Sequence, residues 1–161
     1  MTRLEHLRAK MQAQNVDLVA LGPGAHLAWL TGLRPHADER PFLLCVTQDY
    51  AGILMPALEA NSARQNTDLP FHTWDDAQGP TKALRELLDV SGGCRAQSVV
   101  LDETMRADFA ALVQDALPKA TRQFTASTVG ALRMCKDGDE YAILKRNALS
   151  ADQAMRAAWA A

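Results

Sequence analysis

Apolar positions along the chain alternate between helical and strand-like spacing. Residues 2–15 place Leu4, Leu7 and Met11 on one helical stripe, and Thr2 can cap the start of that helix. The apolar run VDLVALG, residues 16–22, follows directly and predicts a buried strand that ends where glycine and proline appear. The first two predicted elements are therefore a helix and a strand.

The middle of the chain continues this alternation. Residues 26–33 predict a short helical turn, after which 41–47 and 51–56 predict two strands joined by a tight turn. A helix is expected over 58–65 and a further short strand over 69–74.

The second half repeats the pattern with longer helices. Helices are predicted over 81–90, where two glycines stop the pattern, and over 105–117, where a proline stops it. Strands are predicted over 98–102 and 122–127. Strands that alternate with helices predict an α/β fold, which we interpret as a three-layer α/β/α domain with a mixed central sheet, followed by a linker helix.

The C-terminal segment has a different character. From Asp139 onward, Leu144, Ala148, Met155 and Trp159 form an apolar stripe at helical spacing with no glycine or proline to stop it. A helix that still presents an apolar face at its end is expected to pack on something outside this sequence.

Composition narrows the class of protein. The 161 residues are 48% hydrophobic and 22% charged, as in an ordinary globular protein, and the net charge of −2 argues against nucleic acid as a partner. No window approaches the roughly 20 apolar residues that a membrane span needs. The N-terminus lacks the apolar core of a signal peptide, and the three cysteines are widely spaced. We therefore expect reduced thiols and a cytoplasmic protein.

Several familiar chemical motifs are missing. Gly22 and Gly24 follow a strand, but Leu27 stands where a dinucleotide-binding fingerprint needs its third glycine, and Asp102 lies too far along the chain to serve as its acid. The sequence has no phosphate-binding P-loop, no nucleophile elbow and no paired histidines at zinc-binding spacing. Nucleotide binding and nucleophilic catalysis are accordingly disfavoured.

One polar connector remains as a candidate site. His36, Asp38, Glu39 and Arg40 lie within five residues, between two prolines that stiffen the loop. A loop that satisfies its own charges through weak local pairs explains this cluster. On the residues alone we favour this explanation over binding of a charged ligand, and a metal would need more ligands than this loop provides.

A family resemblance distinguishes these alternatives. The segment HLAWLTGL resembles the Asn-x-x-Tyr-Leu-Thr-Gly signature of the creatinase/prolidase/aminopeptidase P family. Leu30, Thr31 and Gly32 match that signature, while His26 and Trp29 replace its asparagine and tyrosine. The segment ERPFLLCV is similar to the entry into the central strand pair of that family.

The third matching segment runs from 132 to 155 and resembles the linker between the N-terminal and catalytic domains of the family. Three segments in the correct order identify the chain as a member, most similar to an Xaa-Pro dipeptidase. The resemblance divides it into an N-terminal domain, 1–132, and a linker with the first helix of a missing catalytic domain, 133–161. The matching linker positions are Arg133, Lys136, Glu140, Leu144 and Ala148.

The resemblance implies a metal-dependent peptidase that hydrolyses Xaa-Pro bonds. Its pita-bread catalytic domain would bind two divalent ions, manganese, cobalt or zinc, through two aspartates, a histidine and two glutamates. This constellation is missing here, so we expect no catalytic and no metal-binding residue in this chain, and the fragment alone should be inactive.

The resemblance also implies a role for the polar connector. In prolidase-like relatives the corresponding loop often reads Asp-x-His-Glu-Arg, crosses a homodimer and meets the carboxylate of a proline-containing dipeptide. Here His36 and Asp38 have exchanged places, while Glu39 and Arg40 match. These four residues are the predicted substrate-binding group. An aminopeptidase P, a creatinase-like hydrolase and a non-enzymatic binding module are the alternatives.

Overall fold

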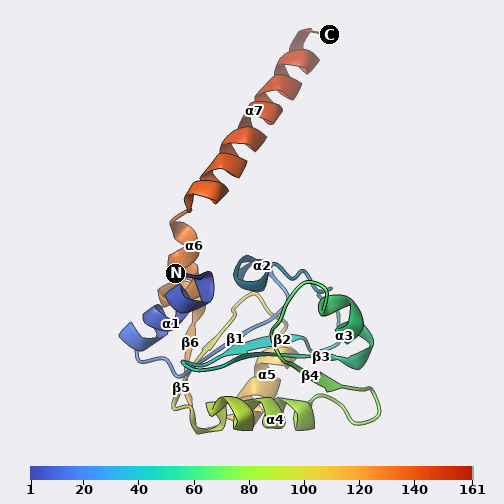
Figure 1. Ribbon diagram of the computed structural model, residues 1–161, viewed down its shortest axis with the longest axis vertical. Coiled ribbons are helices and arrows are strands. Elements are labelled where there is room, and N and C mark those ends of the chain that lie inside the picture. The colour runs from blue at the N-terminus through green and yellow to red at the C-terminus, as the bar shows by residue number, and fades with distance from the viewer. Residues whose placement is uncertain (161) are drawn as a thin grey trace.

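The computed structural model describes residues 1–160 and contains a mixed six-stranded sheet (Figure 1). Strand β1 pairs in antiparallel fashion with β2 and in parallel fashion with β5, and the order across the sheet is β4-β3-β2-β1-β5-β6. The mixed sheet that the sequence predicts is thereby confirmed. The strands are β1 (Leu18–Leu21), β2 (Leu43–Val46), β3 (Ala51–Pro56), β4 (Phe71–Trp74), β5 (Ser98–Leu101) and β6 (Thr121–Phe124).

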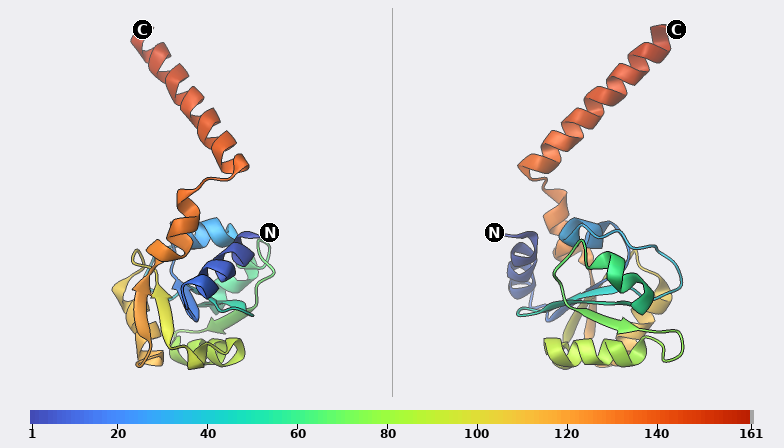
Figure 2. Two further views of the ribbon diagram at one scale, coloured as in Figure 1. Left: turned by 90° about the vertical axis from the view of Figure 1, so that its left-hand side faces the viewer. Right: turned by 45° about the vertical axis from the view of Figure 1, so that its right-hand side comes forward.

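Helices cover both faces of the sheet and complete the three layers. In Figures 1 and 2, α4 and α5 lie on one face, and α1, α2, α3 and α6 lie on the other. The short helix α6 was not predicted from the sequence. The α-helices are α1 (Arg3–Ala13), α2 (Ala25–Thr31), α3 (Ala57–Ala63), α4 (Thr81–Ser91), α5 (Ala107–Ala116), α6 (Val129–Met134) and α7 (Gly138–Ala160), with short 3-10 helices η1 (Gly93–Arg95) and η2 (Thr125–Ser127).

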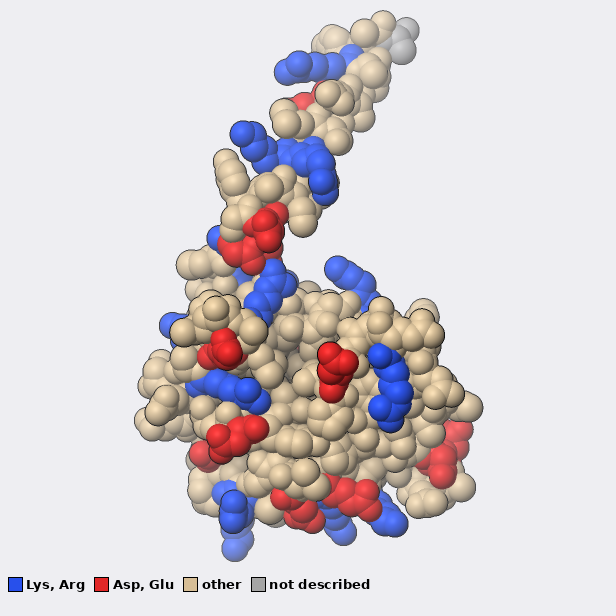
Figure 3. Space-filling view, viewed as in Figure 1, with Lys and Arg blue, Asp and Glu red and all other residues tan. Residues whose placement is uncertain are grey.

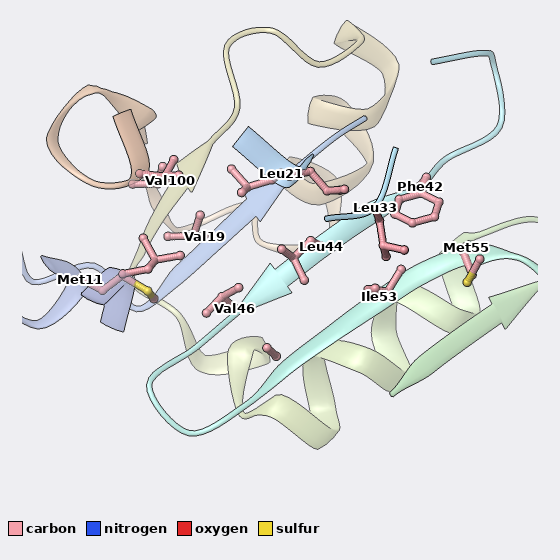
Figure 4. Packing of buried hydrophobic residues seen from close by; sticks show 14 of the residues in the cluster. Met11, Val19, Leu21, Leu33, Phe42, Leu44, Val46, Ile53, Met55 and Val100 are labelled. Atoms are coloured by element: carbon pink, nitrogen blue, oxygen red, sulfur yellow. The ribbon is translucent and has the colours of Figure 1, made fainter. Parts of the chain in front are cut away.

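Strand β1 shows how the two cores form. Successive side chains of a strand point to opposite faces, so Val19 and Leu21 join the cluster under α1 and α2, whereas Leu18 and Ala20 join the cluster under α4 and α5. Figure 4 shows the first cluster, in which Val19, Leu21 and Leu44 lie between the strands and the covering helices. A strand in this position is apolar throughout because both of its faces are buried.

The helix ends follow the sequence signals closely. Thr2 and Glu5 form a reciprocal capping box at the start of α1, as the side chain of Thr2 accepts from the Glu5 amide and that of Glu5 accepts from the Thr2 amide. Helix α4 ends at Ser91 and is followed by the C-cap residue Gly92, whose φ of 72° lies in the left-handed region that glycine adopts readily. Local chemistry thus sets these boundaries.

Helix α7 stands apart from the three layers. It extends away from the sheet (Figures 1 and 2), and no residue of it is buried. Trp159 is 92% exposed, and Leu144 and Met155 are exposed as well. None of the helices described over residues 1–160 is long and apolar enough to cross a membrane. Ala161, the last residue of the predicted segment 133–161, lies outside the described residues.

Candidate functional site

The predicted substrate-binding residues lie in the connector between α2 and β2. Asp38 Oδ1 accepts from the backbone amide of Arg40 at 2.9 Å, which tightens the loop into a turn. The guanidinium of Arg40 then reaches the connection between β4 and α4, where Nη2 donates to Asp76 Oδ2 at 2.9 Å. The Asp38 carboxylate is therefore bonded within the loop, whereas the Arg40 guanidinium is paired with a residue outside it.

A cavity of about 350 Å³ opens beside this connector. Arg34, His36 and Asp38 line it from the loop, and Phe42 and Met55 contribute apolar side chains that are almost fully buried. Glu39 and Arg40 are not among the residues that line it. The structure therefore places His36 and Asp38 at a cavity and Arg40 at an ion pair with Asp76. On the side of α3 the lining residues are Glu59, Ser62, Ala63 and Asn66.

Electrostatics places the connector near the start of α5. The pKa of Arg106 is raised, chiefly by its hydrogen bonds to Asp108, and Glu39 and Asp38 add smaller contributions of the same sign. Both carboxylates therefore lie within electrostatic reach of an exposed guanidinium, and the connector is part of a surface of mixed charge.

This surface has no metal-binding geometry of its own. Among residues 1–160, no three histidine, cysteine, aspartate or glutamate side chains lie close enough together to hold a metal ion. The two divalent ions that the family resemblance implies therefore do not fit any cluster of described residues.

A second polar cluster lies at the base of the linker. His26, on α2, is buried, and its Nδ1 lies 3.1 Å from Nη1 of Arg133 on α6. Its Nε2 lies 3.2 Å from the hydroxyl oxygen of Thr125 in η2. That hydroxyl lies 2.7 and 2.8 Å from the two carboxylate oxygens of Glu103. Residues from three distant parts of the sequence, around positions 26, 103 and 125–133, thus meet around one imidazole ring.

The hydrogen-bond directions define the state of the His26 ring. A guanidinium can only donate, so Nδ1 must accept from Arg133. Because the Thr125 hydroxyl donates to Glu103, its oxygen accepts from Nε2–H of His26. The ring is therefore neutral, with its proton on Nε2. The pKa of His26 is lowered, first by burial, with Arg133 adding to the effect and Asp102 and Glu103 opposing it.

A neighbouring set of contacts holds the start of α7. Trp29, one turn further along α2, donates from Nε1 to Glu140 Oε1 at 2.7 Å. The Arg3 guanidinium lies 4.6 Å from the centre of the Trp29 ring and donates to Asp137 Oδ2 at 3.0 Å. Figure 3 shows acidic and basic side chains next to each other where α7 leaves the domain.

These contacts link the substituted signature positions to the linker. His26 and Trp29, which replace the asparagine and tyrosine of the family signature, contact Arg133 and Glu140, two positions where the linker matches the family pattern. We call the pairs His26–Arg133 and Trp29–Glu140 the α2–linker contacts. Sequence reasoning missed this pairing, although a spacing of three residues on a helix signals that the two side chains share one face.

Comparison with family models assigns the chain to a class. Residues 3–135 match the model of the creatinase/prolidase N-terminal domain. The match extends over most of the sequence, and the chain belongs to this family. A comparison with curated proteins found no match.

Solved structures agree with this assignment. A dipeptidase from Pyrococcus horikoshii is 30% identical, with a TM-score of 0.73 over 86% of this chain and 38% of its own. A recombinant prolidase from Thermococcus sibiricus is 20% identical, with a TM-score of 0.76 over 86% and 38%. A proline dipeptidase from Streptococcus pneumoniae is 17% identical, with a TM-score of 0.76 over 84% and 100%. The latter two show the fold alone. This chain spans 38% of the length of the first two proteins.

Proposed function

We propose that this chain is the N-terminal cap and dimerisation domain of an Xaa-Pro dipeptidase. The observation that carries the proposal is the family match over residues 3–135, together with the 30% identity to the Pyrococcus horikoshii dipeptidase. The X-Pro dipeptidase of Streptococcus pyogenes contains a domain of the same family, with a TM-score of 0.68 to this chain.

In this proposal, hydrolysis takes place in a catalytic domain joined to α7. Two divalent ions, manganese, cobalt or zinc, would activate water there for attack on the bond before proline. Residues 1–160 supply no ligand set for them, and the 161-residue chain should be inactive alone. A cytoplasmic location belongs to the same proposal, because a reducing compartment suits the cysteines Cys45, Cys94 and Cys135, which are free in the described part.

The connector would act on the substrate across a homodimer. Arg40 or His36 would pair with the carboxylate of a proline-containing dipeptide, and Asp38 and Glu39 would help to close the pocket. The Arg40 side chain is 33% exposed and its partner Asp76 is 68% exposed. Breaking this ion pair so that Arg40 can bind the substrate therefore costs only about 0–1 kcal/mol. A charge-assisted hydrogen bond from Arg40 to a desolvated substrate carboxylate contributes about 1.5–3 kcal/mol, which is more than the loss of the bond to Asp76.

The test is kinetic and uses the longer enzyme that contains both domains. Arg40→Ala and His36→Ala should raise the KM for Ala-Pro or Leu-Pro by roughly 10-fold to 100-fold, because the loss of a charge-assisted bond is worth about 1.5–3 kcal/mol. The effect on longer peptides should be smaller, since their carboxylate lies elsewhere. Arg122→Ala is the matched control, because Arg122 lies on the edge strand β6 and donates to Gln114.

Three outcomes would count against the proposal. An unchanged KM for dipeptides in both variants would remove the carboxylate-binding role of the connector. Preference of the parent enzyme for longer peptides would favour an aminopeptidase P. Turnover of Ala-Pro by the 161-residue chain with manganese would contradict the proposal that hydrolysis requires the catalytic domain.

A further inference from the structure

We propose that protonation of His26 releases α6 from α2 and thereby loosens the connection between the sheet domain and α7. The inference goes beyond the proposed function, because it concerns only residues of this chain and holds whatever reaction the longer protein catalyses. It rests on the direction of the hydrogen bonds around one buried ring.

The neutral ring holds α6 in place. Nδ1 of His26 accepts from Arg133, while Nε2–H donates to Thr125, so each nitrogen has one partner. Helix α6 is only six residues long, and its one buried side chain is that of Val129 at its start. Arg133 lies near its other end and leads directly into residues 135–137 and α7. The His26–Arg133 bond therefore secures the end of α6 that faces the linker.

A second proton on the ring removes this bond. Protonated histidine has a donor on both nitrogens, and the new Nδ1–H would face the Nη1 donor of Arg133. Two donors cannot bond to each other, and two positive charges at 3.1 Å repel each other in a partly buried site. The ring and the guanidinium must then separate, and α6 moves with Arg133.

The remaining charged groups around the ring allow it to take up a proton. Asp102 and Glu103, which follow β5, both favour the charged form of His26. Asp102 is 2% exposed, and its Oδ2 has no hydrogen-bond partner among the described residues. Glu103 is already bonded to Thr125, and within residues 1–160 Arg133 is the cation that acts on the ring. The ring is therefore subject to two carboxylates that favour its charged form and to a cation that opposes it.

The sign of the pH dependence follows from this balance. Because the pKa of His26 in the folded chain lies below its usual 6.5, the unfolded or released form binds the proton more readily. The His26–Arg133 contact is accordingly complete at pH values above 6.5 and weakens as the pH falls below it. The Trp29–Glu140 contact contains no histidine, so the two α2–linker contacts should respond differently to acid.

The experiment is an NMR titration of the 161-residue chain from about pH 8 to about pH 5, the range in which histidine titrates. Ring nitrogen shifts of His26 report which nitrogen carries the proton. Hydrogen-exchange protection of the Leu132 and Arg133 amides, corrected for the pH dependence of intrinsic exchange, reports whether α6 is held. We expect the proton on Nε2 at high pH and a loss of α6 protection that follows the titration of the ring.

Two variants separate this mechanism from general acid destabilisation. His26→Asn places an uncharged acceptor close to the position of Nδ1 and should make α6 protection independent of pH. Arg133→Gln keeps a donor but removes the charge, so His26 should take up its proton at higher pH. His6→Gln, at an exposed position on α1, is the control and should retain the response of the parent chain.

Either of two results would overturn the proposal. One is a His26 ring that titrates while the protection of α6 stays constant. The other is a proton on Nδ1 at high pH, since Nδ1 could not then accept from Arg133. If His26→Asn weakens α6 at every pH, the Arg133→Gln titration still decides, because an unshifted or lowered His26 titration would exclude the repulsion on which the mechanism depends.

Discussion

The sheet domain and α7 belong to one chain, but the sheet domain buries its apolar residues and α7 leaves its apolar residues exposed. All four residues of β1 are buried between two layers of helices, whereas none of the residues of α7 is buried. Helix α7 is nevertheless continuous from Gly138 to Ala160, because it is rich in alanine and its start is capped by reciprocal bonds between Asp137 and Glu140. The comparison shows that local signals can form a helix even where none of its residues is buried.

The largest expected effect lies in the sheet domain. Phe109, on α5, is fully buried in the cluster under α4 and α5. Phe109→Ala should lower the free energy of unfolding by about 3–5 kcal/mol, because it removes buried apolar area and leaves a cavity. Urea denaturation followed by circular dichroism measures this change. Phe124→Ala is the matched control on β6, where the ring is 59% exposed, and should have little effect; equal losses would contradict the assigned core.

An intermediate effect is expected where the two regions meet. Trp29→Phe keeps an aromatic ring beside Arg3 but removes the donor to Glu140, so the free energy of unfolding should fall by about 1 kcal/mol. Thermal and urea unfolding measure it. Trp159→Phe, at the exposed end of α7, should leave stability unchanged. If both variants behave alike, the Trp29–Glu140 bond does not stabilise the junction.

The smallest effect on stability is expected on α7. Leu144 is 53% exposed, so Leu144→Ala should change the free energy of unfolding by less than about 0.5 kcal/mol. The same change should weaken self-association, which we expect through the exposed residues Leu144, Met155 and Trp159. Light scattering over a range of concentrations tests this, and a strict monomer of the parent chain would contradict it.

Most of the fold could be predicted because its signals are local. The capping of α1 by Thr2 and the stop of α4 at Gly92 are properties of a few adjacent residues, and the apolar runs around Leu18 and Val99 mark strands with both faces covered. Helix α6 was not predicted because six residues are too few to show a helical pattern, and because it is held by a contact with His26, which is distant in sequence.

The candidate site could be predicted only in part for the same reason. The cluster from His36 to Arg40 is visible in the sequence, but the ion pair of Arg40 joins it to Asp76, 36 residues away. The contacts of His26 with Thr125 and Arg133 span 99 and 107 residues. No spacing rule connects such positions, since only the folded sheet brings them together. The predicted boundary between residues 132 and 133 falls within α6 and stays a prediction.

The placement of both α2–linker contacts on one seven-residue helix has a consequence for engineered chimeras. Exchanging the linker alone between relatives would separate Arg133 and Glu140 from the side chains that receive them. An interchangeable unit must include at least α2 together with residues 125–140, although nearly a hundred residues separate the two pieces along the chain. Hybrid proteins that transfer both pieces should retain the native direction of α7, and those that transfer one should lose it.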